Sequence, residues 1–109
     1  MRLTNTQYHL KWVQRIREPV LRFYGNGQLA CIRCGFSDSR ALILDHIEGN
    51  GRQDLRRRKI AGGHVLYGQL LREGFPPGYQ TLCWNCNVIK AFERKEFETA
   101  SSNVYKVRT

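Results

Sequence analysis

Apolar residues recur at helical spacing in the first part of the chain, which predicts an amphipathic helix with a basic outer face. Thr4 and Gln7 have the spacing of a capping box, so the helix should begin directly behind Thr4. Pro19 has no backbone N–H and clashes with the preceding turn, so we expect a kink or break near Glu18. Residues 25–27, Gly-Asn-Gly, should end the helix. Its apolar positions are Tyr8, Trp12, Val13, Ile16, Val20, Phe23 and Tyr24.

The short apolar run at residues 41–44 predicts a buried strand, and the second run, Tyr-Gln-Thr-Leu at residues 79–82, can form another strand. Between them, residues 65–71 predict a short helix, which Gly74 and the prolines after it should stop. The apolar positions that follow the second run predict a closing helix over residues 85–97. The chain shows no internal repeat and no linker long enough to divide it. We therefore expect one small α+β domain.

The composition is strongly basic, because 18 Lys+Arg against 9 Asp+Glu give a formal net charge of +9. Such a charge favours a polyanionic partner, either nucleic acid or an anionic membrane surface. Hydrophobic residues make up 41% of the chain, and no segment is apolar over the length that a membrane span needs, so we expect no membrane partner. The N-terminus lacks the apolar stretch of a secretory signal, which favours a cytoplasmic, reducing location.

The four cysteines form two Cys-x-x-Cys pairs, Cys31 with Cys34 and Cys83 with Cys86. Four soft ligands are the set that tetrahedral zinc takes in a closed structural site. Four unbound cysteines are the plain alternative, and a thioredoxin-like redox site lacks the βαβ unit that it needs. The first pair suits a tight knuckle followed by Gly35, and the second opens the closing helix, an arrangement that looks like a treble-clef zinc finger. Structural Zn²⁺ bound there should hold the fold and take no part in catalysis.

Three residues with side chains suited to metal and proton binding stand next to the expected zinc ligands. Asp45 and His46 follow the first apolar run, and Asn87 follows the last cysteine. If both cysteine pairs meet at one zinc, these three side chains should converge. Carboxylate and amide oxygens suit a hard cation such as Mg²⁺, and a neutral imidazole can take a proton from an attacking water. The pattern fits phosphodiester hydrolysis, although a histidine at a strand end is more often a plain hydrogen-bonding residue.

The order of these residues resembles a known nuclease family. A Cys-x-x-Cys pair is followed by Leu-Asp-His-Ile at residues 44–47 and by Leu-Cys-Trp-Asn-Cys-Asn-Val-Ile-Lys at residues 82–90. This series resembles the HNH endonucleases, also called ββα-metal or His-Me finger nucleases, in their zinc-stabilised branch, which is common in phages. It is also similar to phage endonucleases that resolve Holliday junctions. The resemblance covers residues 31–93 and leaves the N-terminal helix and the tail unmatched.

The resemblance implies a role for each matching residue. His46 would be the general base that activates water, and Asp45 and Asn87 would hold a catalytic Mg²⁺ or Mn²⁺ ion. Lys90, one turn beyond Asn87 on the same helical face, would lie near the scissile phosphate. Hydrolysis by this family usually leaves a 5′-phosphate and a 3′-hydroxyl.

Two positions depart from the family pattern. Gly78 stands where many members carry an asparagine that braces the loop of the catalytic histidine, and Asn50 is a candidate substitute. Ala91 stands where other members have a further histidine on the last helix. Binding of the catalytic cation would therefore rest on two protein ligands with water and phosphate, which favours Mg²⁺ or Mn²⁺ over Zn²⁺.

A run of basic residues follows the Asp-His pair and is the expected DNA-binding element. A solvated helix face is the plain alternative for this run. We interpret His9 as a surface or capping residue. His64 could approach the site from the segment between the strands, but a loop position before a helix is the better interpretation. Trp84 should shield the zinc or pack on the N-terminal helix. The residues expected to contact phosphates are Arg52, Arg56, Arg57, Arg58 and Lys59.

The expected fold class is a small α+β protein, a treble-clef zinc finger with a ββα-metal (HNH) core behind an N-terminal amphipathic helix. Residues 1–27 would form the helical segment, residues 28–98 the nuclease core and residues 99–109 a C-terminal tail. The expected function is metal-dependent DNA cleavage. A non-catalytic zinc-finger module that binds nucleic acid explains the zinc and the charge equally well, and a zinc-stapled protein-interaction domain explains only the cysteines. High sequence specificity would need a homodimer or a larger nuclease assembly, because the domain offers little reading surface.

Overall fold

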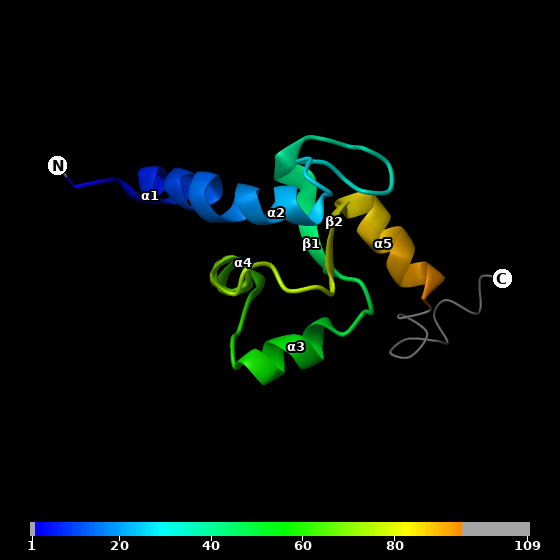
Figure 1. Ribbon diagram of the computed structural model, residues 1–109. Helices are drawn as coiled ribbons and strands as arrows, with labels where there is room; N and C mark the ends of the chain where they lie inside the picture. Colours follow the sequence, from blue (N-terminus) through cyan, green and yellow to red (C-terminus); the bar gives the residue numbers. More distant parts are fainter. Residues whose placement is uncertain (1, 95–109) are drawn as a thin grey trace, which may run out of the picture.

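The computed structural model describes residues 2–94 of the chain. Helices surround a two-stranded antiparallel sheet, so the small α+β class is confirmed (Figure 1). The elements run in the order α1 (Asn5–Trp12), η1 (Val13–Arg17), α2 (Glu18–Tyr24), η2 (Ser39–Ala41), β1 (Leu42–His46), α3 (Gly51–Arg58), α4 (Gly63–Arg72), β2 (Tyr79–Cys83) and α5 (Trp84–Glu93).

The N-terminal helix begins as its sequence predicts. Thr4 Oγ1 accepts a hydrogen bond from the Gln7 backbone N–H at 3.2 Å, and Gln7 Oε1 accepts one from the Thr4 N–H at 2.7 Å. These two bonds complete the capping box and satisfy donors that a helix start otherwise leaves unpaired.

A kink or break was expected near Glu18, and the helix is not broken at Pro19 but has an irregular turn directly before Glu18. A π-helical turn, η1, precedes the proline, and the Glu18 N–H bonds to the Val13 carbonyl, five residues back. The wider turn shifts the hydrogen-bond register by one residue, so Pro19 begins a new α-helical segment, where a missing N–H costs nothing. The backbone therefore stays helical from Asn5 to Tyr24.

The second half of this helix builds the core, whereas α1 buries no residue. Leu21 joins a cluster of buried residues with the sheet and the cysteines, and Val20 and Tyr24 join a second cluster with α4. Arg17 turns inward, and its Nη2 donates to the carbonyls of Ser39 and Leu42 at 2.9 and 2.7 Å. Helix α2 thus packs against the sheet and α4, and Arg17, the last residue of η1, holds the start of β1.

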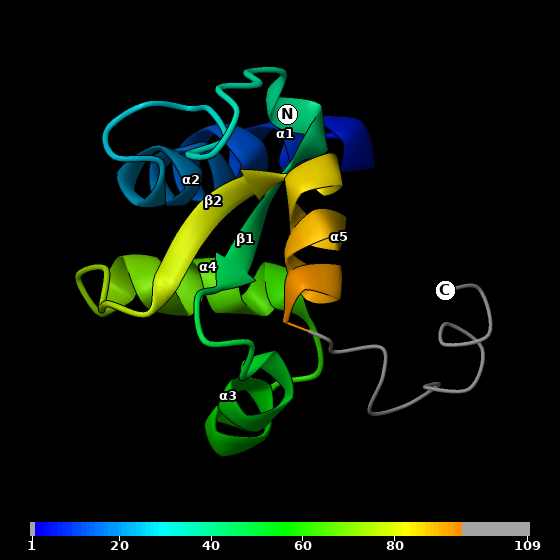
Figure 2. The same ribbon diagram turned by 90° about the vertical axis from the view of Figure 1, so that its right-hand side faces the viewer.

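The register of the sheet determines where the chemistry lies. Leu42 pairs with Cys83 at one end, and His46 pairs with Tyr79 at the other. The first strand is longer than residues 41–44, so Asp45 is inside it and His46 ends it. Helix α5 follows β2 without a loop and runs back beside both strands (Figure 2). The cysteines therefore lie at one end of the sheet and His46 at the other.

The segment between the strands forms α3 and α4. Helix α4 is longer than the predicted residues 65–71 and packs Leu66 and Leu70 onto α2. Helix α3 lies beyond the end of β1 in both views of the molecule (Figures 1 and 2). The closing helix begins one residue before its predicted start, and the predicted stretch from residue 95 onward lies outside the described residues.

Candidate metal centre and histidine site

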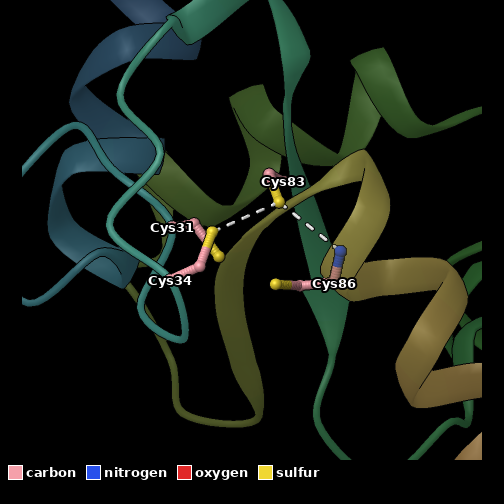
Figure 3. A group of neighbouring side chains, drawn as sticks. All are labelled: Cys31, Cys34, Cys83 and Cys86. Carbon is pink, nitrogen blue, oxygen red and sulfur yellow. Dashed lines mark hydrogen bonds between the residues drawn. The ribbon is translucent and has the colours of Figure 1, made fainter.

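The four cysteines meet at one point, although they come from two distant parts of the chain (Figure 3). Their Sγ atoms all lie within 4.8 Å of one another, and the Cys34 and Cys83 sulfurs are 3.7 Å apart. With Zn–S bonds of about 2.3 Å, the edge of a tetrahedron of sulfurs is about 3.8 Å. The donor set and its spacing therefore fit a structural zinc ion, and a four-cysteine site able to hold a metal is confirmed.

The local backbone explains why each cysteine pair points inward. The Cys31 N–H donates to the Phe36 carbonyl at 2.9 Å, the Gly35 N–H donates to the Cys31 carbonyl at 2.9 Å, and Gly35 takes a φ of 79°. This is the tight knuckle predicted for the first pair. In the second pair, Cys83 caps α5, and its sulfur accepts the Cys86 N–H at 3.4 Å.

The thiols influence one another through their shared space. Burial opposes ionisation of Cys31, but backbone hydrogen bonds outweigh it and lower its pKa to about 6. Burial and the neighbouring thiols raise the pKa of Cys86 to about 12. A negative charge on one sulfur thus hinders ionisation of the neighbouring thiols. A bound divalent cation would stabilise all the thiolates and so overcome this repulsion.

Trp84 lies beside the cysteine cluster, which is the first of its two expected positions. Its side chain is 62% exposed, and it lines an apolar groove with Phe36 and Ile89 next to Cys34.

At the other end of the sheet, the imidazole of His46 is held on several sides. Its Nε2 lies 3.0 Å from Oδ2 of Asp54, and its ring packs against Tyr79 with 4.9 Å between ring centroids. Gly51 lies close to the ring, and a Cβ atom at this residue would be 3.2 Å from Nδ1 and 3.5 Å from Cε1 of His46. The side chain of His46 is 15% exposed, so it is mostly but not fully buried.

Asp54 is the functional candidate that the sequence did not reveal. Its side chain is 3% exposed, and it accepts hydrogen bonds from the Tyr79 hydroxyl at 2.5 Å, Arg57 Nη2 at 2.6 Å and Arg58 Nε at 3.0 Å. Burial alone would raise the pKa of this carboxyl, but these bonds and the one to His46 hold it well below its usual range. Asp54 is therefore a buried carboxylate that stays charged.

Arg58 points into the protein, in contrast to its predicted contact with DNA phosphates. Its side chain is 10% exposed, and its guanidinium donates to Glu73 Oε2 at 2.8 Å and to the Tyr79 oxygen at 3.2 Å. Hydrogen bonds to Glu73, Tyr79 and Asp54 raise its pKa. Its donors are thus used to join α3 to α4 and β2. The other four residues of the predicted set, Arg52, Arg56, Arg57 and Lys59, are exposed.

Asp45 and Lys90 form a buried ion pair beside His46. Lys90 Nζ lies 3.3 Å from Asp45 Oδ2 and donates to the His46 carbonyl at 3.1 Å, and Gln80 Nε2 donates to Asp45 Oδ2 at 2.8 Å. Lys90 is 6% exposed, so its ammonium group is buried next to Asp45 and is not on the surface. Asn87 is half-buried. Helix α5 runs back along the sheet, so Lys90, in the second half of the helix, reaches the carbonyl of His46. Asn87 lies one turn closer to the start of α5.

Backbone and arginine contacts brace the loop after His46, where the family pattern has an asparagine. The Ile47 N–H donates to the Gly78 carbonyl at 3.0 Å, and Arg94 Nη2 donates to the Glu48 carbonyl at 2.7 Å. Asn50 precedes α3, and its side chain makes no capping bond to that helix. Arg94 thus supplies a brace that sequence analysis missed, because its partners are carbonyls and leave no pattern in the sequence.

Compared with known proteins, the chain matches no family model, no curated protein and no solved structure. Within residues 2–94, none of the helices combines the length and the apolar character needed to cross a membrane. His9 and His64 are exposed, and His64 lies in the first turn of α4 and not in the loop before it. Functional inference therefore rests on the two sites themselves.

Proposed function

We propose that this protein is a metal-dependent DNA endonuclease of the HNH kind, with His46 as the general base. The observation that carries the proposal is the environment of His46, whose imidazole is bonded to a buried carboxylate and whose side chain is 15% exposed. A strand pair followed directly by a helix, with zinc ligands at the strand–helix junction, agrees with the ββα arrangement that the sequence resemblance implies.

In the proposed chemistry, each of the candidate side chains has its own role. His46 takes a proton from a water molecule, and the water oxygen forms a bond to phosphorus while the bond to the 3′-oxygen breaks. Asp45 and Asn87 offer one carboxylate and one amide as oxygen ligands, a set that suits Mg²⁺ or Mn²⁺ completed by water and phosphate. Such a cation, when bound, would stabilise negative charge on the phosphate and on the leaving oxygen. The positive charge of Lys90 partly balances the negative charge of Asp45.

Exposed basic residues on α3 supply the binding surface in this proposal. Arg52, Arg56 and Lys59 are exposed on or next to the helix that carries Asp54, and the chain has a formal net charge of +9. Contacts from such residues to phosphates position a duplex with little sequence preference. The α3 helix would therefore bring the DNA backbone to the edge of the sheet where His46 lies.

A non-catalytic, zinc-stabilised nucleic-acid-binding module is the second candidate, and the pairing of Asp45 favours it. Oδ2 of this carboxylate already binds Lys90 and Gln80, and an ammonium ion competes with a divalent cation for the same charge. A protein that only binds DNA would show no metal-dependent cleavage whatever the cation.

A plasmid-cleavage assay separates the two candidates. Zinc-loaded protein is incubated with supercoiled DNA in EDTA, Mg²⁺ or Mn²⁺, beside His46→Ala and a control, His64→Ala, that removes an exposed histidine. The nuclease predicts cutting that needs the cation, is reduced about 10²–10⁴-fold in His46→Ala and is kept in His64→Ala. DNA binding that weakens with salt, without cutting under any metal, would favour the binding module.

A further inference from the structure

We propose that the N-terminal helix, residues 5–24, is a second DNA-binding surface, which contacts phosphates away from the part of the duplex that lies at His46. This helix precedes residues 31–93, the segment that resembles the nuclease family. The inference deepens the proposed function and rests on its DNA partner, not on its cleavage step. The surface includes no residue of the zinc site or of the histidine site.

Helix α1 gains little from packing on the rest of the protein. None of its residues is buried, and Figure 1 shows it running out from the sheet on the side opposite α5. An isolated helix of fewer than about 12 residues is marginal in water, so α1 depends on its capping box and on the continuous backbone through η1 into α2. The protein thus holds a projecting helix whose side chains are open to a partner.

The charged side chains of this segment are almost all positive. Residues 2–24 contain five basic residues and one acidic residue, Glu18. Arg17 turns inward to backbone carbonyls, and the other four basic residues are exposed. Among residues 2–94, no acidic side chain forms an ion pair with any of these four. The four are Arg2, Lys11, Arg15 and Arg22.

Exposed arginines near the cysteine site are paired instead. Arg33 Nη2 lies 2.8 Å from Glu93 Oε1, and Arg40 Nη2 lies 2.6 Å from Asp38 Oδ2. Such pairs largely cancel their own field, whereas unpaired cations attract a polyanion over a longer range. The N-terminal helix therefore carries a positive field of its own, in addition to that of α3.

The contacts of the helix determine which of its sides faces outward. Trp12 packs edge-on against Tyr67 of α4, with 5.9 Å between ring centroids, so this side of the helix faces the protein. Tyr8 and Lys11 are three residues apart and Lys11 and Arg15 are four, so these exposed side chains share one side of the helix. Lysine, arginine and tyrosine all make contacts to DNA phosphates. The helix thus presents a row of groups that suit a phosphate backbone.

This row lies at the other end of the sheet from the histidine. Arg17 bonds to the Leu42 carbonyl at the start of β1, and His46 ends the strand, roughly 14 Å away at about 3.4 Å per residue. From Arg17 the helix continues outward to Asn5 for about 18 Å at 1.5 Å per residue. Duplex DNA rises about 3.4 Å per base pair, so the helix would meet phosphates about four or more base pairs from one bound at His46.

Two double variants with the same change in charge test this surface. The helix variant combines Lys11→Gln with Arg15→Gln and removes two unpaired charges. The control variant combines Arg33→Gln with Arg40→Gln and removes two paired charges. Each lowers the formal net charge of +9 by two, so the overall charge of the two variants is the same. All four side chains are exposed, so both variants should keep the fold and the zinc, which circular dichroism and metal analysis check.

Fluorescence anisotropy at several salt concentrations measures binding to a duplex of about 30 base pairs, which is long enough to span both surfaces. Each phosphate contact contributes about 0.9 to the slope of log K against log salt concentration. The helix variant should lower this slope by about 1.8 and weaken binding about 10-fold or more at about 0.1 M salt, and the control variant should keep the slope. Cleavage at saturating DNA should be the same in the helix variant and the wild type, because the helix contacts no reacting atom.

The outcomes separate this inference from the proposed cleavage. An unchanged slope in the helix variant, or equal losses in both variants, would overturn the inference whether or not the wild type cuts DNA. Binding of the wild type to vesicles that contain phosphatidylserine, lost in the helix variant while DNA binding is unchanged, would assign the helix to an anionic membrane surface and overturn it as well. A wild type that cuts no DNA with Mg²⁺ or Mn²⁺, beside a helix variant with the lowered slope, would refute the cleavage and support the second surface.

Discussion

Replacing Arg58 with methionine tests whether this residue is part of the protein interior or of the DNA-binding surface. Methionine keeps an unbranched side chain of similar length but removes the guanidinium. That group donates to Asp54, Gln69, Glu73 and Tyr79 over distances of 2.8 to 3.2 Å. It is the only described side chain that links α3 to both α4 and β2 through such bonds.

The expected cost follows from what the substitution leaves behind. Breaking a buried ion pair costs about 3–5 kcal/mol when the remaining charge loses its main partner. Asp54 keeps three other hydrogen-bond donors, and the side chain of Glu73 is 45% exposed, so water can replace the arginine there. We therefore expect Arg58→Met to lower the free energy of unfolding by about 2–3 kcal/mol.

Urea unfolding at a fixed zinc concentration, followed by circular dichroism, measures this loss. Arg56→Met is the control, because Arg56 is exposed on the same helix and should change stability by less than about 0.5 kcal/mol. Arg56→Met should instead weaken DNA binding and reduce its salt dependence by about one phosphate contact. If Arg58→Met kept full stability and lost DNA affinity in the same way, the inward position of Arg58 would be wrong.

The remaining predictions concern the zinc site, one carboxylate and one buried hydroxyl. Chelating the metal or changing Cys83 to serine should unfold the protein, because structural zinc contributes about 10–16 kcal/mol, and a cooperative thermal transition that survives chelation would contradict this. Asp54 has a lowered pKa in the folded state, so its contribution to stability is complete above about pH 4 and is lost as the pH falls below that value. Asp54→Asn should therefore lose less stability than the wild type between about pH 5 and pH 3 in urea titrations, and parallel losses would count against it. Thr81 Oγ1 donates to the Leu21 carbonyl at 2.8 Å in a fully buried position, so Thr81→Val should cost about 1 kcal/mol in the same titration, and no loss would mean that the bond contributes nothing.

Local patterns predicted much of this fold. The capping box at Thr4, the two apolar runs and the two cysteine pairs are contained in a few neighbouring residues each, and each appears where expected. Near Glu18, where a kink or break was expected, the helix accommodates Pro19 with a π turn and does not break. Such a turn depends on which carbonyls the packed helix leaves free, and no residue pattern encodes it.

The histidine site was less predictable, because its partners are set by the register of the sheet and by where α3 returns. Asp54 stands among arginines in the sequence. Its spacing from Arg57 and Arg58 indicates only ordinary i, i+3 and i, i+4 ion pairs within one helix. Its bond to His46 follows only once α3 lies beyond the end of β1. Arg58 belongs to the same basic run, and only its face on the short helix separates it from the exposed members.

Because the two sites lie at opposite ends of the sheet, a spectroscopic probe in the metal site would lie well away from the histidine. Strand β1 spans five residues between them, which at about 3.4 Å per residue separates the sulfur cluster from His46 by roughly 14 Å. Co²⁺ has the same charge as Zn²⁺ and accepts tetrahedral thiolates, yet it absorbs visible light. The visible absorption of cobalt-loaded protein would thus show whether the metal site and the fold are intact. The cobalt would lie a strand's length from His46, so it should leave the surroundings of the histidine unchanged.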